Sequence, residues 1–75
     1  MIRELDTVVL ARDLPEFGLE RGDVGAVVHL YAGEMALEVE FVSGSGATVA
    51  VETLAMSDVR ALGAEEILHA RARAA

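Results

Sequence analysis

The chain has no cysteine and no lysine among its 75 residues, and it has a single proline. Without cysteine, the protein has neither a disulfide framework nor a thiolate metal site. Its longest apolar run is too short for a membrane span, and the residues after Met1 are Ile2, Arg3 and Glu4, which do not form an apolar signal region. We therefore expect one small cytoplasmic domain, held together by packing alone or with help from oligomerisation.

Positive charge is also scarce, because 13 acidic residues stand against 6 arginines and the formal net charge at pH 7 is −7. Such a surface repels a phosphate backbone, so direct nucleic-acid binding is disfavoured unless a local basic patch exists. The arginines are scattered, and only Arg71 and Arg73 lie close together, near the C-terminus. The charge balance favours a basic protein as partner.

The predicted fold is organised around residues 19–30. Gly22 and Asp23 signal a turn, because glycine reaches positive φ without a steric penalty and aspartate accepts backbone N–H bonds. Gly25 lies inside the β-branched run that follows, where glycine marks a bulge or a close approach of the backbone. We expect the strand to bend here and to serve two sheets of a small barrel, so Gly22, Asp23 and Gly25 are the residues on which the fold depends.

Alternation of apolar and polar residues predicts five short strands, over residues 6–10, 24–31, 37–42, 48–53 and 60–62. Pro15 suits the start of a helical turn and Gly18 its end. Phe17 and Leu19 then fold back to plug one end of the barrel; an exposed, functional Phe17 is the alternative. Five short strands at hairpin spacing are typical of a small closed barrel.

The composition changes at Gly63, where an alanine-rich segment begins. Residues 64–73 have high helix propensity, with glutamates at the start and arginines at the end, as the helix dipole favours. Ile67 and Leu68 form a narrow apolar stripe. Because so short a helix is marginal alone, it packs on the barrel, packs on another chain, or frays. The predicted domains are a barrel over 1–62 and a C-terminal helix or tail over 63–75.

Few residues offer chemistry. His29 lies in the bent strand and His69 in the C-terminal segment, and no spacing joins them to further ligands, so we expect no metal and no cofactor. Asp23 suits a cation or a substrate hydroxyl, but aspartate in such a turn more often bonds its own backbone. No serine or threonine belongs to a nucleophile–histidine motif, and carboxylates that face water lack the pKa shifts of catalysis. We therefore expect no enzymatic activity.

The glutamates alternate with apolar residues over 37–42, so Glu38 and Glu40 are expected to face water. Glu52 on the next strand would extend the same acidic face, and Asp58 follows in the loop after it. An acidic sheet face selects a basic partner by charge complementarity. We predict partner binding by Glu38, Glu40, Glu52 and Asp58, with plain solvation of these side chains as the alternative.

Five blocks of the sequence resemble the DUF4926 family of small bacterial proteins. They are Asp6-Thr7-Val8-Val9-Leu10, Leu14-Pro15 with Gly18-Leu19, Gly22-Asp23-Val24-Gly25 with Val27-Val28-His29, Glu38-Val39-Glu40-Phe41-Val42, and Asp58-Val59-Arg60. The resemblance spans residues 5–62 and implies an SH3-like barrel without an established enzymatic activity. An antitoxin or immunity role is the function that it implies. The loop 43–47 is less charged than expected for the family, and the segment after Gly63 lies outside the family core.

The predicted fold class is mainly β: a five-stranded SH3-like barrel with a short C-terminal α-helix. The predicted function is a non-enzymatic protein-interaction module whose partner is a basic protein, such as a toxin or nuclease whose nucleic-acid site it covers. Two alternatives stay open. One is a nucleic-acid- or ribosome-associated barrel, and the other is a structural subunit of a homo-oligomer.

Overall fold

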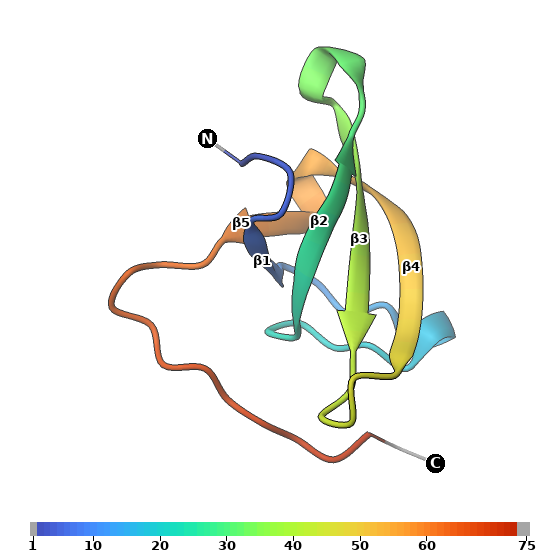
Figure 1. Cartoon of the computed structure of the whole chain (residues 1–75), viewed down its shortest axis with the longest axis vertical. Coiled ribbons are helices and arrows are strands. Elements are labelled where there is room, and N and C mark those ends of the chain that lie inside the picture. The colour runs from blue at the N-terminus through green and yellow to red at the C-terminus, as the bar shows by residue number, and fades with distance from the viewer. Residues whose placement is uncertain (1, 74–75) are drawn as a thin grey trace.

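The computed structural model describes residues 2–73 and is mainly β, as predicted (Figure 1). The strands are β1 (Thr7–Leu10), β2 (Val24–Leu30), β3 (Ala36–Val42), β4 (Thr48–Ala55) and β5 (Val59–Ala61). Three single-turn 3-10 helices lie in the connections: η1 (Pro15–Phe17), η2 (Ala32–Glu34) and η3 (Met56–Asp58). Each of the five predicted strands is present. No helix among residues 2–73 is long and apolar enough to cross a membrane.

The five strands form one antiparallel sheet in the order β4-β3-β2-β1-β5. β2 pairs with β1 near its start, through Val24 to Ala26, and with β3 from Ala26 to Leu30. Both pairings belong to one sheet, so the prediction that this strand serves two sheets is not confirmed. The prediction of a closed barrel is not confirmed. The sheet is open, because no pairing joins β4 to β5 within the described residues. β5 is three residues long, and all three pair with β1.

Gly22, in the turn before β2, and Gly25, within β2, have different structural roles. Gly22 adopts a φ of 95°, in the region that favours glycine, and its amide donates to the carbonyl of Leu10. Gly25 provides a close approach: a Cβ built there would lie 2.6 Å from Cγ1 of Val39 and 2.9 Å from Cε1 of Phe41. β2 thus lies against β3 at a distance that only glycine permits.

A bulge in β2 lies beyond Gly25, where the pairing with β3 shifts between Val27 and His29. After the shift, His29 pairs with Glu38 and Leu30 with Leu37. Simple alternation would put Val27 and His29 on one face of the strand. The bulge instead leaves Val27 in the core and brings His29 beside Glu38 on the opposite face.

The core lies on one face of the sheet, beneath the loop that contains η1. Leu14 and Leu19 flank η1, pair with each other in an isolated bridge and are buried, while Phe17 packs against the same cluster. Phe17 and Leu19 therefore fold back onto the core as predicted, although the sheet has no closed barrel end for them to plug. The side chains with the least exposure are those of Val8, Leu10, Leu14, Val27, Leu37 and Val39.

The prediction of a C-terminal helix over residues 64–73 is wrong. Residues 63–73 contain one turn and otherwise run extended around one side of the molecule (Figure 1); residues 74–75 of the predicted segment lie outside the described residues. Ile67 and Leu68 are 92% and 65% exposed, so the apolar stripe packs on no surface formed by residues 2–73. A short helix without tertiary packing does not offset the cost of its nucleation, whatever its propensity.

Candidate functional site

The outer face of the sheet, defined here as the face of β2, β3 and β4 opposite the core, holds two of the four predicted binding residues. Glu38 and Glu40 lie on β3 between the buried Leu37, Val39 and Phe41. Successive side chains of a strand point to opposite faces, so both carboxylates point away from the core. This is the placement that the sequence predicts.

A row of polar and aromatic side chains crosses this outer face next to Glu38. The hydroxyl of Tyr31 donates a hydrogen bond of 2.7 Å to Oε1 of Glu38. The ring of His29 lies edge-on to that of Tyr31, with the ring centroids 4.4 Å apart. Nδ1 of His29 is 3.6 Å from Oε2 of Glu4, and these two groups form an ion pair only when the imidazole is protonated. The bulge in β2 makes this row possible because it brings His29 onto this face.

The hydrogen bond between Tyr31 and Glu38 has an electrostatic consequence. It raises the pKa of the Tyr31 phenol, because the bond holds the phenol proton and ionisation would put a second negative charge beside the carboxylate. At neutral pH, Tyr31 is therefore a neutral donor that orients Glu38. This arrangement fixes an acceptor at the surface and provides no nucleophile.

Apolar side chains are exposed around the second carboxylate of the outer face. Glu40 accepts a hydrogen bond of 2.7 Å from the hydroxyl of Thr48 and pairs with Val51 on β4. Val51 and Val42 are 44% and 55% exposed, and Val28 at the bulge is 41% exposed. Carboxylates with fixed orientations beside exposed valines give a surface with both the charge and the apolar area that protein contacts use.

Glu52 does not belong to the outer face. It pairs with Val39 across β3 and β4, and directly opposed residues of antiparallel strands share a face. Val39 is fully buried, so Glu52 points to the same side of the sheet as the core. The prediction assumed regular pairing from Val42 and Thr48, which would oppose Glu52 to Glu38. A register shift between Phe41 and Val42 moves β4 by one residue and reverses its faces.

Asp58 lies in η3 and is used within the fold. Its Oδ2 accepts the backbone N–H of Ala55 at 3.0 Å, and its Oδ1 accepts Nε of Arg12 at 2.7 Å. The hydrogen bond from Arg12 lowers the pKa of the Asp58 carboxyl. This carboxylate joins η3 to the end of β1, so the structure gives it a stabilising role and places it outside the outer face.

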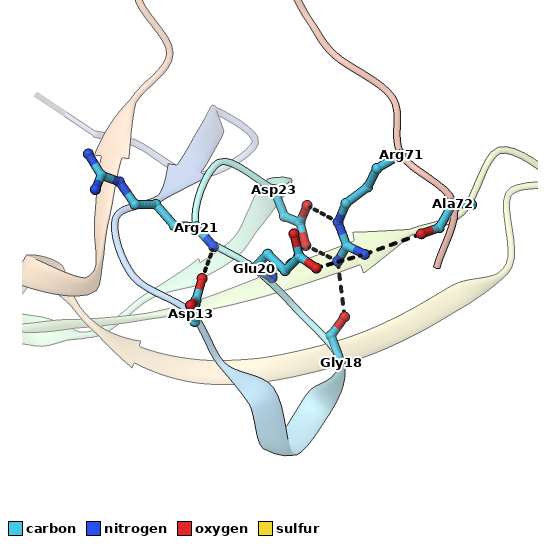
Figure 2. Close-up of polar contacts among 7 residues, drawn as sticks. All are labelled: Asp13, Gly18, Glu20, Arg21, Asp23, Arg71 and Ala72. Carbon is cyan, nitrogen blue, oxygen red and sulfur yellow. Dashed lines mark hydrogen bonds and ion pairs between the residues drawn. The ribbon is translucent and has the colours of Figure 1, made fainter. Parts of the chain in front are cut away.

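A second cluster of polar contacts lies at the other end of β2 and is shown in Figure 2. The carboxylate of Asp23 accepts the backbone N–H of Glu20 at 2.8 Å, which is the turn bond that the sequence predicts. It also accepts Nε and Nη2 of Arg71, at 2.9 and 2.6 Å. Nη2 of Arg71 also donates to the carbonyl of Gly18 at 3.0 Å, and its Nη1 is 3.6 Å from Glu20. The Arg71 guanidinium lowers the pKa of Asp23.

A groove with a volume of about 480 Å³ adjoins this cluster. The turn before β2, the β3–β4 hairpin and the C-terminal tail surround it, and Leu19, Phe41 and Val49 give it apolar walls. His69 and Arg71 contribute from the tail. His69 thus lies near the start of β2, and His29 near its end. No cluster of three potential metal-ligating side chains occurs in the part of the chain that is described.

Sequence reasoning missed Tyr31 and Arg71 as site residues. Tyr31 is the only tyrosine of the chain and ends the strand predicted over residues 24–31, which was the one available signal. Arg71 was noted only as a basic neighbour of Arg73. Its contact with Asp23 joins positions 48 residues apart, and no local pattern encodes such a contact.

The sheet and its outer face define a small antiparallel β protein that presents carboxylates beside apolar side chains. The chain belongs to the family described as a domain of unknown function (DUF4926), whose model matches residues 4–61. The resemblance found in the sequence is therefore confirmed. The match ends at the last residue of β5, so Arg71 and the tail lie outside it. Neither a curated protein nor a solved structure matches the chain.

Proposed function

We propose that this protein is a non-enzymatic interaction module that binds a basic protein through the outer face of its sheet. The observation that carries the proposal is the pair Glu38 and Glu40, oriented by Tyr31 and Thr48 beside exposed valines. Each of these two hydrogen bonds uses one oxygen of a carboxylate that offers about four acceptor positions in all. Both glutamates therefore keep acceptor capacity for an arginine or a lysine of the partner.

The overall charge supports the same partner. A net charge of −7 on 75 residues raises the rate of encounter with a basic protein and disfavours nucleic acid. The specific role that we propose is antitoxin- or immunity-like, in the cytoplasm, where the module covers the cationic nucleic-acid site of a toxin or nuclease.

The test is capture from an extract of the source cells on immobilised protein, at low and at high salt. The decisive variant is Glu38→Gln with Glu40→Gln. Its matched control is Glu16→Gln with Glu65→Gln, which removes the same charge from exposed positions in η1 and the tail. We expect a basic protein to bind the wild type and the control, to be lost from the outer-face variant, and to elute as salt rises.

Two results would contradict the proposal. Equal loss in both double variants would mean that net charge matters and the outer face does not. A salt-sensitive band with mixed RNA and DNA in a gel shift would support the nucleic-acid alternative instead.

A homo-oligomeric role is the second candidate, because β4 and β5 are unpaired edges within the described sheet. Such edges offer backbone groups to another strand. Light scattering over a range of concentrations tests it, and a constant monomer mass would exclude it.

A further inference from the structure

We infer that the turn from Gly18 to Asp23 is a recognition site for an arginine in an extended segment of a partner protein, and that the chain's own Arg71 occupies this site. The site immediately precedes β2, whereas Tyr31 immediately follows it, so the two lie at opposite ends of this strand. The inference therefore goes beyond the proposed function and does not rest on it.

The geometry of the bound guanidinium is specific for arginine. Nε and Nη2 of Arg71 donate to the two oxygens of Asp23, and Nη2 also reaches the carbonyl of Gly18 (Figure 2). A planar fork makes these bonds from fixed positions, whereas the compact ammonium of lysine cannot reproduce them together. Glu20 adds a second negative charge on the Nη1 side. The turn thus offers a set of acceptors that matches a guanidinium.

The turn is held in place by bonds that do not involve the tail. The amide of Leu10 donates to the carbonyl of Asp23, and the amide of Gly22 donates to the carbonyl of Leu10. Asp23 also exchanges two bonds with Glu20, one from its backbone amide and one to its carboxylate. These bonds attach the turn to β1 and fix the Asp23 carboxylate. The site is therefore organised before any arginine enters, which lowers the cost of binding.

The tail that delivers Arg71 is attached at few points. Glu66 bonds to Arg60 through two contacts of 2.7 Å and accepts the amide of Gly63. Beyond Glu66, Ile67 and Leu68 stay exposed, and the anchoring contacts that the structure shows are those of Arg71. The tail is also outside the family match, whereas the turn is inside it. A site in the matched region is thus filled by an appended segment that the partner's arginine can replace.

The groove beside the site indicates what accompanies the arginine. Alanine occupies both positions next to Arg71, so the tail adds little apolar contact to the groove, whose wall offers the half-buried Val49 beside the almost fully buried Leu19 and Phe41. A partner segment with an apolar residue next to its arginine would bury that side chain here. Such a segment would gain contacts that the tail does not make.

The test uses the full chain with Arg71→Ala, labelled for amide NMR, and a capped peptide with the sequence of residues 69–73. We expect the peptide to shift the amides of Gly18 and of residues 20–23. We expect Arg71→Ala to bind it about two- to fivefold more tightly than the wild type, because this variant removes the competing ion pair in cis, whose side chains are only 27% and 18% exposed. Glu20→Gln in the Arg71→Ala background should weaken binding, and its side chain takes no part in the backbone bonds of the turn.

The matched control is the same peptide with lysine at the position of Arg71, and we expect it to bind more weakly. A second peptide with leucine in place of the alanine after the arginine should bind more tightly. Equal binding of the arginine and lysine peptides, or equal binding by the wild type and Arg71→Ala, would overturn the inference. Shifts confined to β3 and β4 would overturn it too, because they would mark the outer face as the site. The amide spectrum of each variant shows whether it is folded.

Discussion

Replacing Gly25 by alanine should lower the free energy of unfolding by about 1–3 kcal/mol. The added Cβ would lie 2.6 Å from Cγ1 of Val39, 2.9 Å from Cε1 of Phe41 and 3.0 Å from the carbonyl oxygen of Glu40. Carbon atoms normally make contact at about 3.5–4.0 Å. Val39 is fully buried and Phe41 is 3% exposed, so neither side chain has free space to move into. β2 and β3 would have to separate at the middle of the sheet.

The size of the loss follows from two opposing effects. Overpacking in a buried site costs about 1–3 kcal/mol, while alanine restricts the unfolded chain and returns about 0.4–1 kcal/mol only where the native backbone tolerates it. At Gly25 the clash prevents that gain. A domain of 75 residues has a total stability of about 4–11 kcal/mol, so the loss is a substantial fraction of it.

Urea unfolding followed by far-UV circular dichroism measures the effect, with two other glycines as controls. Gly44→Ala meets nothing within 4 Å and should change stability by less than about 0.5 kcal/mol. Gly22→Ala also has open space, but its φ of +95° should cost about 1–2 kcal/mol through the backbone alone. An unfolding midpoint for Gly25→Ala equal to that for Gly44→Ala would refute the close approach as the reason for glycine at this position.

Three further predictions concern the core, the loops and the outer face. Leu14→Ala removes a side chain that is 1% exposed and should lower the free energy of unfolding by about 2–5 kcal/mol in urea titrations. The hydrogen bond from Arg12 lowers the pKa of Asp58 below its ordinary value of 3.8. This bond therefore stabilises the fold above pH 3.8, and the stabilisation is lost as the pH falls through the pKa of Asp58 in the folded protein. In urea titrations at decreasing pH, the stability advantage of the wild type over Asp58→Asn should shrink accordingly. The absorbance of the Tyr31 phenolate should titrate above the ordinary pKa of 10.0, and Glu38→Gln should lower that pKa.

The sequence is informative about strands because apolar alternation reports burial directly. Leu37, Val39 and Phe41 alternate with glutamates, and the structure has a strand over Ala36–Val42 with these three residues buried. The register in which neighbouring strands pair is harder to predict from the sequence. The shifts at Val27/His29 and at Phe41/Val42 each insert one residue without a local signal, and the second of them reverses the face of Glu52.

The tail shows the limit of propensity as a guide. Residues 64–73 favour a helix locally, yet Ile67 and Leu68 find no surface that would stabilise one. The candidate sites show that local sequence motifs do not predict contacts between distant parts of the chain. Tyr31 meets Glu38 because η2 and its turn bring β3 back beside β2, and Arg71 meets Asp23 because the extended tail returns to the start of β2. Both contacts depend on the folded path of the chain.

Mapping the bound partner on the protein tests the central claim most directly. Amide NMR of the labelled chain, with and without the captured basic protein, reports which strands meet it. The account predicts shifts in β3 and β4 around Glu38, Glu40 and Val51 and at the end of β2 near Tyr31, together with a change in the fluorescence of this single tyrosine. Shifts confined to β1, β5 or η3, with the tyrosine unchanged, would contradict binding through the outer face.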